Sequence, residues 1–406
     1  MPAETENRIA GRAKARGKQF EEVAVQIDSR WLRLLVVLTF VMLAFLSFAP
    51  EFAAEQRLLK LAIPLGLPAD TWSYYVPRAN PMTEAKVELG RKLFFDARLS
   101  ADGKVSCSSC HDPKLAFGDG KAVAEGIGGK LGTRNSPSLF NAMFYPNQFW
   151  DGRAEGLEDQ AIQPLTNPIE MGNASYDQVV ARLKTLPEYR SEFQVVFGGE
   201  VTIARVGQAI AAYERTLVSG DSPFDRFNAG DQSAMSDAAK RGLTVFRGRG
   251  HCSRCHTFSD ALPFFTDFQY HNTGVAMNDS RFDKLSRIAF DAVDTERSRE
   301  VIDRLAQQPG GEELGRVRFS YVVFDIGAFR TPTLRNIALT APYFHDGSAR
   351  ALAEVVKFYN EGGKQNVARE WDLAPLALTE TEQRDLVAFL ESLTGKLPEM
   401  EISAKR

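Results

Sequence analysis

Apolar side chains recur at helical spacing in several stretches of this 406-residue chain. Residues 83 to 94 keep one apolar face, and Thr83 at their start is typical of a helix N-cap. The same spacing occurs over residues 202 to 217, and Thr379 and Glu382 form a capping box ahead of a last apolar face. Alternating patterns typical of strands are scarce. The pattern therefore predicts a mainly α fold.

A run without charge, residues 34 to 49, follows a polar segment in which basic side chains outnumber acidic ones. It is short for a membrane span, although Trp31 and Phe52 could extend it at the interfaces. The basic side precedes the run, so an anchor would leave the rest of the chain outside the cytoplasm. A cleaved signal peptide has the same polarity, and a buried soluble helix is a third interpretation. We expect an anchor or signal within residues 1 to 50 and a linker over residues 51 to 80.

All four cysteines fall in two Cys-x-x-Cys pairs, and a histidine follows each pair directly. In this spacing two thioethers fix the edge of a porphyrin, and the adjacent imidazole reaches the iron as its proximal ligand. A zinc site made from both pairs would leave both histidines unexplained, and disulfides are a further alternative in an oxidising compartment. The motifs predict two covalently bound haem c groups. Their residues are Cys107, Cys110 and His111 for the first haem, and Cys252, Cys255 and His256 for the second.

The two motifs divide the chain into two similar units. A short pattern, Gly-x-x-apolar-Phe, precedes each cysteine pair and starts at Gly90 and at Gly242. Each copy indicates an amphipathic helix that leads into a haem-attachment loop, and the predicted last helix would close the second unit. We expect two cytochrome-c-like domains, at residues 81 to 233 and 234 to 398. A Gly-, Pro- and Asn-rich loop over residues 118 to 147 is expected to wall the first haem pocket.

The first haem lacks an obvious second ligand. No histidine occurs between His111 and His251, so a local histidine cannot close the first iron. Met143 and Met171 remain possible ligands, although a methionine in a loop more often packs. An iron with one protein ligand keeps a position open for peroxide or oxygen, whereas a six-coordinate iron indicates electron transfer.

Beyond the haem motifs, residues 80 to 396 resemble the bacterial di-haem cytochrome c peroxidases, within the branch that includes MauG. The resemblance implies a peroxidatic N-terminal haem, an electron-transfer C-terminal haem and a calcium ion between the domains. The segments that carry it are LGRKLFFDARLS, RNSPSLFNA, QFWDGRAEGLEDQA, NPIEMG and FRTPTLRNIALTAPYFHDG.

The resemblance also assigns residues to the first haem. Glu170 would be the acid/base that moves a proton between the two peroxide oxygens before the O–O bond breaks. Gln160 would orient peroxide or water, and Pro164 would shape the distal pocket. Trp150 matches a tryptophan between the haems that passes electrons. Taken alone, these residues could equally be surface or core side chains.

Calcium would be bound by oxygen donors, which suit this hard ion. By resemblance, these are Asn135 and the backbone carbonyls of Thr340 and Pro342.

The chain departs from ordinary members of the family at two points. The loop after the first haem lacks the histidine that blocks the iron in many of them, so we expect an enzyme that needs no reductive activation. The second haem would be bound by Tyr359, fourteen residues after His345, where ordinary members have methionine. MauG-like proteins also have a tyrosine there, and an anionic phenolate should lower the haem potential. Met277, His271 and His251 are rival ligands.

Three further side chains, His271, His345 and Arg335, are candidate partners of haem propionates. Residues 278 to 325 are charged and match the family poorly, so we expect an insertion near the second haem.

The first functional hypothesis is a periplasmic di-haem peroxidase, tethered to the inner membrane by its N-terminal helix, that reduces hydrogen peroxide through a high-valent state shared by both haems. A small periplasmic cytochrome c or a cupredoxin is the expected donor, and the resemblance implies a homodimer as one assembly. The second hypothesis is a MauG-like oxidase that modifies residues of a partner protein. The third is a membrane-tethered electron carrier or haem sensor without turnover. The net charge of -3 gives no polyanion-binding signature, so nucleic acid is not an expected partner.

Overall fold

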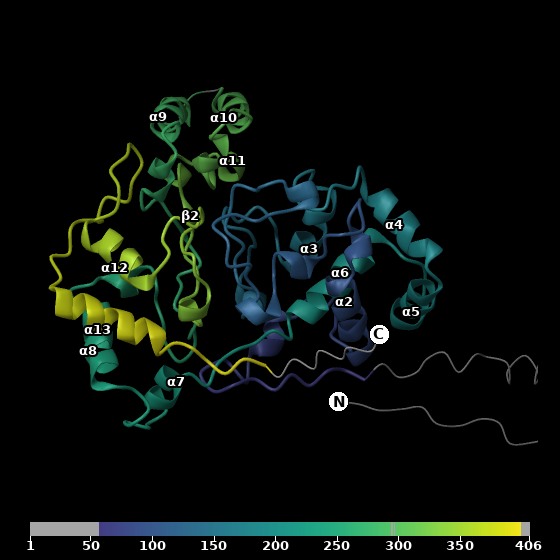
Figure 1. The fold of residues 1–406 in the computed structure, drawn as a ribbon, viewed down its shortest axis with the longest axis horizontal. Coiled ribbons are helices and arrows are strands. Elements are labelled where there is room, and N and C mark those ends of the chain that lie inside the picture. Colours follow the sequence, from purple (N-terminus) through teal and green to yellow (C-terminus); the bar gives the residue numbers. More distant parts are fainter. Residues whose placement is uncertain (1–56, 294, 296, 399–406) are drawn as a thin grey trace, which may run out of the picture. The chain divides into compact units, whose positions relative to one another are not determined.

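The computed structural model describes residues 57–293, 295 and 297–398, which form the coloured ribbon of Figure 1. The apolar run over residues 34 to 49, and with it the predicted anchor or signal, lies outside the described residues. Within the described ranges, no helix is both long and apolar enough to cross a membrane.

The described part of the chain is mainly helical, as the pattern of apolar positions predicts. Two short strands, β1 (Tyr270–His271) and β2 (Phe329–Arg330), pair antiparallel with Tyr270 opposite Arg330. The helices are α2 (Glu84–Phe95), α3 (Leu157–Thr166), α4 (Tyr176–Thr185), α5 (Pro187–Phe197), α6 (Ile203–Glu214), α7 (Pro223–Asn228), α8 (Asp237–Arg247), α9 (Phe282–Val293), α10 (Ser298–Ala306), α11 (Val317–Ser320), α12 (Leu352–Asn360) and α13 (Glu380–Glu391).

Three helices begin where the sequence signals place them. The side chains of Thr83, Thr202 and Thr379 accept hydrogen bonds from backbone N–H groups in the first turns of α2, α6 and α13. Such caps satisfy donors that have no partner inside the helix. The capping box between Thr379 and Glu382 is also present. The three predicted helices are therefore confirmed.

The repeated glycine motif marks the same kind of helix crossing in both halves of the chain. A methyl group on Gly90 of α2 would lie 1.8 Å from the carbonyl oxygen of Ala209 in α6. A methyl group on Gly242 of α8 would lie 1.9 Å from the carbonyl oxygen of Asp385 in α13. Since only glycine permits so close an approach of backbones, the motif fixes how each helix crosses its partner. The prediction that the last helix closes the second unit is confirmed.

Separate apolar cores lie around the two crossings. The first contains Leu93 and Phe94 of α2 together with Ile210 of α6. The second contains Phe246 of α8 and Phe389 of α13. The polar stretch before α8 joins α7 to α8, and the domain boundary placed there stays a prediction.

The poorly matching segment, residues 278 to 325, folds into α9, α10 and α11, which lie together in Figure 1. We call this segment the helical insert. It has a core of its own, in which Phe282 and Leu285 of α9 pack with Ile302 of α10. The indole of Trp150 packs against the same core. The insert is thus a folded helical segment with its own apolar core and not a solvated loop.

The crossing of α8 and α13 gives a test of the fold. The substitution Gly242→Ala is expected to lower the free energy of unfolding by roughly 1–3 kcal/mol or more, because the two backbones must move apart. Chemical denaturation of the haem-loaded protein, followed by circular dichroism, measures it. Gly132→Ala is the control, since its methyl group would lie 3.4 Å from the carbonyl oxygen of Ala124, an ordinary contact. Equal midpoints for both variants would contradict the role of Gly242.

Candidate functional site

The first Cys-x-x-Cys-His motif forms a tight turn at the end of the path from α2. Cys107–Ser109 make a short 3-10 helix, η3, and the N–H of His111 donates to the carbonyl of Cys107 at 3.0 Å. The Ser109 hydroxyl accepts from the N–H of Ser106 at 3.0 Å and holds the entry to this turn. The turn places both sulfurs and the imidazole in one compact loop.

The second motif repeats this geometry after α8. Cys252–Arg254 form the 3-10 helix η7, and the N–H of His256 donates to the carbonyl of Cys252 at 2.9 Å. Two segments far apart in the sequence therefore build the same local structure, as the shared spacing predicts.

Both histidines are oriented by a backbone carbonyl. Nδ1 of His111 lies 3.0 Å from the carbonyl oxygen of Phe117, and Nδ1 of His256 lies 2.9 Å from that of Phe265. A carbonyl can only accept, so Nδ1 carries the proton and Nε2 keeps its lone pair free for a metal. Burial lowers the pKa of both imidazoles, which favours the neutral form that binds iron.

The cysteines are free thiols in this structure, and the disulfide alternative is not met. Among residues 57–293, 295 and 297–398, one group of metal-type side chains lies close enough to hold an ion, namely Cys255, Asp267 and His271. It includes no cysteine of the first pair, so the structure does not support a zinc site built from both pairs.

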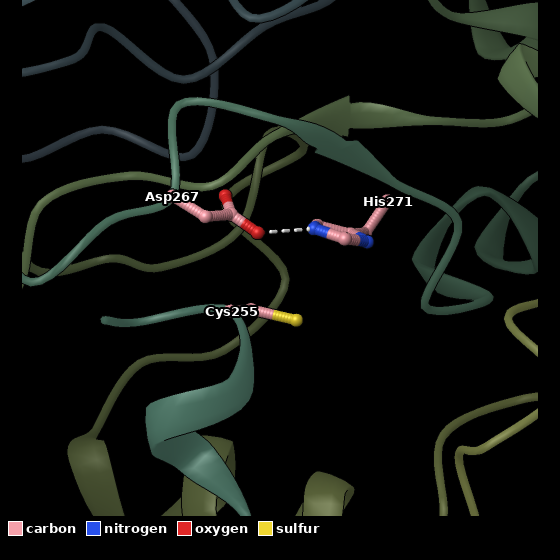
Figure 2. Close-up of side chains that lie close together, drawn as sticks. All are labelled: Cys255, Asp267 and His271. Carbon is pink, nitrogen blue, oxygen red and sulfur yellow. Dashed lines mark hydrogen bonds and ion pairs between the residues drawn. The ribbon is translucent and has the colours of Figure 1, made fainter.

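Each ring nitrogen of His271 has a carboxylate partner. Figure 2 shows the hydrogen bond with Asp267. Nε2 lies 2.8 Å from Oδ2 of Asp267, and Nδ1 lies 3.0 Å from Oε1 of Glu370. Burial alone would lower the pKa of His271, but its contacts with Asp267, Cys255 and Glu370 raise it to about 12. An imidazolium has no lone pair for iron, so these contacts disfavour His271 as a haem ligand.

A cavity of about 470 Å³ opens beside the second motif. Its wall includes Cys252, Cys255 and His256 from the motif, and Tyr359 from α12. Burial raises the pKa of the Tyr359 phenol most strongly, and the nearby thiols of Cys255 and Cys252 raise it further. The rival ligand Met277 instead packs against the core of the helical insert. The structure thus brings Tyr359 and His256 to one cavity, as a pair of axial ligands requires.

The cavity also holds buried polar groups that need a partner. Nε and Nη1 of the buried Arg330 guanidinium have no hydrogen-bond partner among the described residues, and Arg330 lines the cavity. A haem carries two propionate carboxylates, and a buried guanidinium without a partner is suited to bind one of them. The residues present therefore fit a haem at this position.

The expected propionate partner Arg335 is engaged elsewhere. Its Nη1 and Nη2 donate to the carboxylate of Asp225 at 2.9 Å each, and its Nε donates to the carbonyl of Pro263 at 2.7 Å. The ion pair is almost completely buried. Arg330 is the better candidate, and it was missed because its sequence context gives no signal that sets it apart from Arg335.

His345 also differs from the expectation. Its Nε2 lies 2.8 Å from Oε2 of Glu313, and its ring stacks on Phe329 with centroids 3.6 Å apart. Glu313 in turn accepts from Nη1 of Arg134 at 2.6 Å. His345 is therefore part of a buried charged cluster with the helical insert.

The residues assigned to the first haem gather on α3 and the turn that follows it. Gln160 and Pro164 are four residues apart on α3, and so share one face of the helix. Glu170 lies in the next turn, where Nδ2 of Asn167 donates to its Oε1 at 2.9 Å. Burial raises the pKa of Glu170, and the positive charge of Arg153 opposes this shift.

Burial raises the pKa of both thiols of the first attachment loop most strongly, and the charge of Glu170 adds to this shift, which indicates that Glu170 lies near the loop. The predicted wall, residues 118 to 147, packs beside it, since the N–H of Ile127 donates to the carbonyl of Glu170 at 2.9 Å. A buried carboxyl not foreseen from the sequence, Glu214, has its pKa raised to about 8 by burial. It too raises the pKa of the Cys107 thiol.

Trp150 connects the two halves of the chain. Its Nε1 donates to the backbone carbonyl of Asn135 at 2.9 Å, and its own carbonyl accepts from the N–H of Arg330 at 2.8 Å. Trp150 and Asn135 line the cavity at the second motif, as do Thr340 and Pro342. The three residues assigned to calcium thus line the same cavity, although they are separated by about two hundred positions in the sequence, and the calcium site itself stays a prediction.

Comparisons with known proteins agree with this geometry. The family model of di-haem cytochrome c peroxidases (CCP_MauG) matches residues 84–233. The chain is 39% identical to the methylamine utilization protein MauG of Methylorubrum extorquens over 79% of this chain and 81% of that protein. It is 36% identical to the cytochrome c551 peroxidase of Pseudomonas aeruginosa over 88% of this chain and 92% of that protein. A crystal structure of a MauG-like protein associated with microbial copper homeostasis superposes with a TM-score of 0.67 at 33% identity, covering 83% of this chain and 96% of the other.

Two attachment loops of the same geometry, in a mainly helical fold, define a di-haem c-type protein. The chain belongs to the di-haem cytochrome c peroxidase and MauG family. It is a di-haem peroxidase, an oxidoreductase that acts on hydrogen peroxide and carries two haem c groups.

Proposed function

We propose that this enzyme reduces hydrogen peroxide at the first haem and receives electrons through the second. The observation that carries the proposal is that the side chains near the two haem-attachment loops differ. The first has a buried carboxyl, Glu170, beside its attachment loop, and the second has Tyr359 and His256 on one cavity wall. A proton-transfer group belongs where bonds break, whereas an iron with two ligands suits electron transfer.

When bound, haem supplies the redox chemistry, since its iron binds peroxide and exchanges electrons. The protein supplies proton transfer and orientation. Glu170 takes the proton from one peroxide oxygen and returns it to the other, which leaves as water. Asn167 keeps one carboxyl oxygen in place, and Gln160 orients the peroxide from the same side of α3.

Electrons pass between the sites by way of Trp150. Its indole is held by a hydrogen bond to Asn135, and the guanidinium of Arg330 lies 5.8 Å from its ring centroid. Arg330 would bind a propionate of the second haem and would then connect the relay residue to that group. Asn135, Thr340 and Pro342 would hold a calcium ion through oxygen ligands, which would stabilise the same junction.

The first haem is proposed to keep an open position. Met143 and Met171 are both buried within apolar clusters, where their thioethers pack with other core side chains. The resting enzyme then needs no reductive release of a blocking ligand.

Export to the periplasm is inferred from covalent haem attachment, and tethering by residues 34 to 49 remains a prediction of the sequence. A small periplasmic cytochrome c or a cupredoxin is the proposed donor, and the homodimer is a proposal from family resemblance.

A second candidate function, a MauG-like oxidase that modifies a partner protein, is favoured by one observation. Tyr359 lies in the cavity of the second haem, and MauG proteins of Methylorubrum extorquens and Methylophilus methylotrophus are relatives at 39% and 35% identity. Steady-state peroxide consumption with a reduced cytochrome favours the peroxidase. Consumption only in the presence of a protein substrate favours the oxidase, and no consumption in either assay leaves an electron carrier or sensor.

The role of Glu170 is tested by Glu170→Gln, which keeps the shape of the side chain but cannot carry a proton between oxygens. We expect kcat/KM for peroxide to fall on the order of 100-fold or more, with haem attachment unchanged. Stopped-flow measurement of peroxide decay gives the rate. Glu155→Gln, which changes an exposed carboxylate just before α3, is the control. An unaltered rate in Glu170→Gln would remove Glu170 from the mechanism.

The pH dependence follows from the raised pKa of Glu170. As a base the carboxyl must be ionised, so kcat/KM should fall as the pH falls through a pKa above the ordinary value of about 4.3. Arg153→Gln removes the positive charge that lowers this pKa. The acid limb of the pH profile should therefore move to higher pH in this variant. A limb that stays in place or moves down would show that another group titrates.

The second ligand is tested by electron paramagnetic resonance of the ferric protein. We expect one high-spin and one low-spin haem, and Tyr359→Met should change the low-spin signal only. Tyr343→Phe is the matched control, since Tyr343 lines the same cavity but lies outside the predicted ligand set. Two low-spin haems at rest would contradict the open first site, and an unaltered spectrum of Tyr359→Met would contradict the ligand assignment.

A further inference from the structure

The helical insert over residues 278 to 325 has no part in the chemistry described so far. Several of its charged side chains form exposed ion pairs, such as Arg287 with Asp283 at 3.1 Å, and such pairs contribute little to the stability of the fold. Two others, Glu313 and Arg316, differ because they reach residues more than 150 positions earlier in the chain. Trp150 and Asn135 are joined by a hydrogen bond. Arg316 contacts the segment that follows Trp150, and Glu313 contacts Arg134, which precedes Asn135.

Arg316 holds the backbone that directly follows Trp150. Its Nη1 donates to the carbonyls of Asp151 at 3.0 Å and of Gly152 at 3.1 Å, and its guanidinium lies 4.1 Å from the ring centroid of Tyr270. Gly152 has a φ of +70°, and a methyl group there would lie 1.8 Å from the Tyr270 hydroxyl. Arg316 therefore holds the Trp150 segment against the insert, next to a glycine whose positive φ other residues rarely adopt.

Glu313 holds the other partner of that hydrogen bond. Its carboxylate joins Nη1 of Arg134 at 2.6 Å and Nε2 of His345 at 2.8 Å. Arg134 directly precedes Asn135, whose own N–H donates to the carbonyl of His345 at 2.8 Å. Glu313 thus holds Arg134, which precedes Asn135 in the chain, and His345, which accepts the hydrogen bond of the Asn135 N–H. The carbonyl of Asn135 accepts from Trp150.

The core of the insert completes the contact, since Trp150 packs against the cluster that contains Phe282 and Leu314. We propose that the helical insert holds the Trp150 side chain in place, and we call it the mount of Trp150. Arg316 and Glu313 are the positioning residues that fix the indole against the carbonyl of Asn135. This inference rests on the proposed function, in which Trp150 passes electrons between the two haem sites. Electron exchange between those sites then depends on residues that touch neither haem-attachment loop.

The test uses the full haem-loaded chain with Arg316→Ala, Arg316→Lys and Trp150→Phe, and Arg287→Ala as the matched control on the same insert. Ultraviolet resonance Raman spectra report the indole N–H hydrogen bond, and subtracting the Trp150→Phe spectrum isolates the Trp150 band. We expect Arg316→Ala to shift this band toward a weaker hydrogen bond, Arg316→Lys to restore it in part, and Arg287→Ala to leave it unchanged.

Rapid-mixing spectroscopy gives the rate at which an electron delivered to the second haem reaches the first. We expect Arg316→Ala to slow it roughly tenfold, because a remote change that displaces a group by about 1 Å can cost up to roughly 100-fold and the other contacts of Trp150 remain in this variant. If the rate is normal in Trp150→Phe, the relay role of Trp150 fails, while a shifted Raman band still supports the mount. If Trp150→Phe is slow but both band and rate are normal in Arg316→Ala, the mount is wrong.

Glu313→Gln approaches the same junction from the other side and keeps the size of the side chain. It should shift the Trp150 band in the same direction as Arg316→Ala. Should Arg316→Ala fail to fold or to attach haem, Arg316→Lys and Glu313→Gln decide the matter, and an unshifted band in both overturns the proposal.

Discussion

Each haem-attachment loop depends on one hydrogen bond, between Nδ1 of its histidine and a backbone carbonyl. For His111 this carbonyl belongs to Phe117, and for His256 it belongs to Phe265. The bond fixes the tautomer and the orientation of the ring, so the lone pair of Nε2 points where a metal can take it. Without this constraint the imidazole could rotate or accept a proton at the metal-binding nitrogen. The helix crossings at Gly90 and Gly242 hold the helices that lead into these loops.

The junction of the two sites is built from segments that are distant in the sequence. Trp150 donates to Asn135, Asn135 is held by His345, and Glu313 joins His345 to the helical insert. Each contact is a single hydrogen bond with a modest net contribution, but a buried donor or acceptor left without its partner is costly. The network therefore tolerates little displacement. This is the property that the proposed electron transfer through Trp150 would require.

Buried charges in this protein fall into two kinds. Arg335 and Asp225 are both almost fully buried and satisfy one another, and removing one partner of such a pair typically costs about 3 to 5 kcal/mol. Arg330 is buried as well, yet its Nε and Nη1 have no partner in the part of the chain that the structure describes. The first pair supports the fold, whereas the second guanidinium is available to a ligand carboxylate. The contrast between two arginines five positions apart separates a structural role from a binding role.

The sequence by itself determined the features that depend on neighbours along the chain. The spacing of cysteines and histidine, the caps at Thr83 and Thr379, and the repeated glycine motif are local, so their geometry follows from a few adjacent residues. Only the tertiary structure decided which distant side chains meet. His271 is paired with Glu370, 99 positions away, and His345 with Glu313, 32 positions away, and nothing in their sequence surroundings encodes these partners. The same holds for the mounting of Trp150 by the helical insert, because a contact across more than 150 residues is fixed by how the cores pack and not by any local pattern.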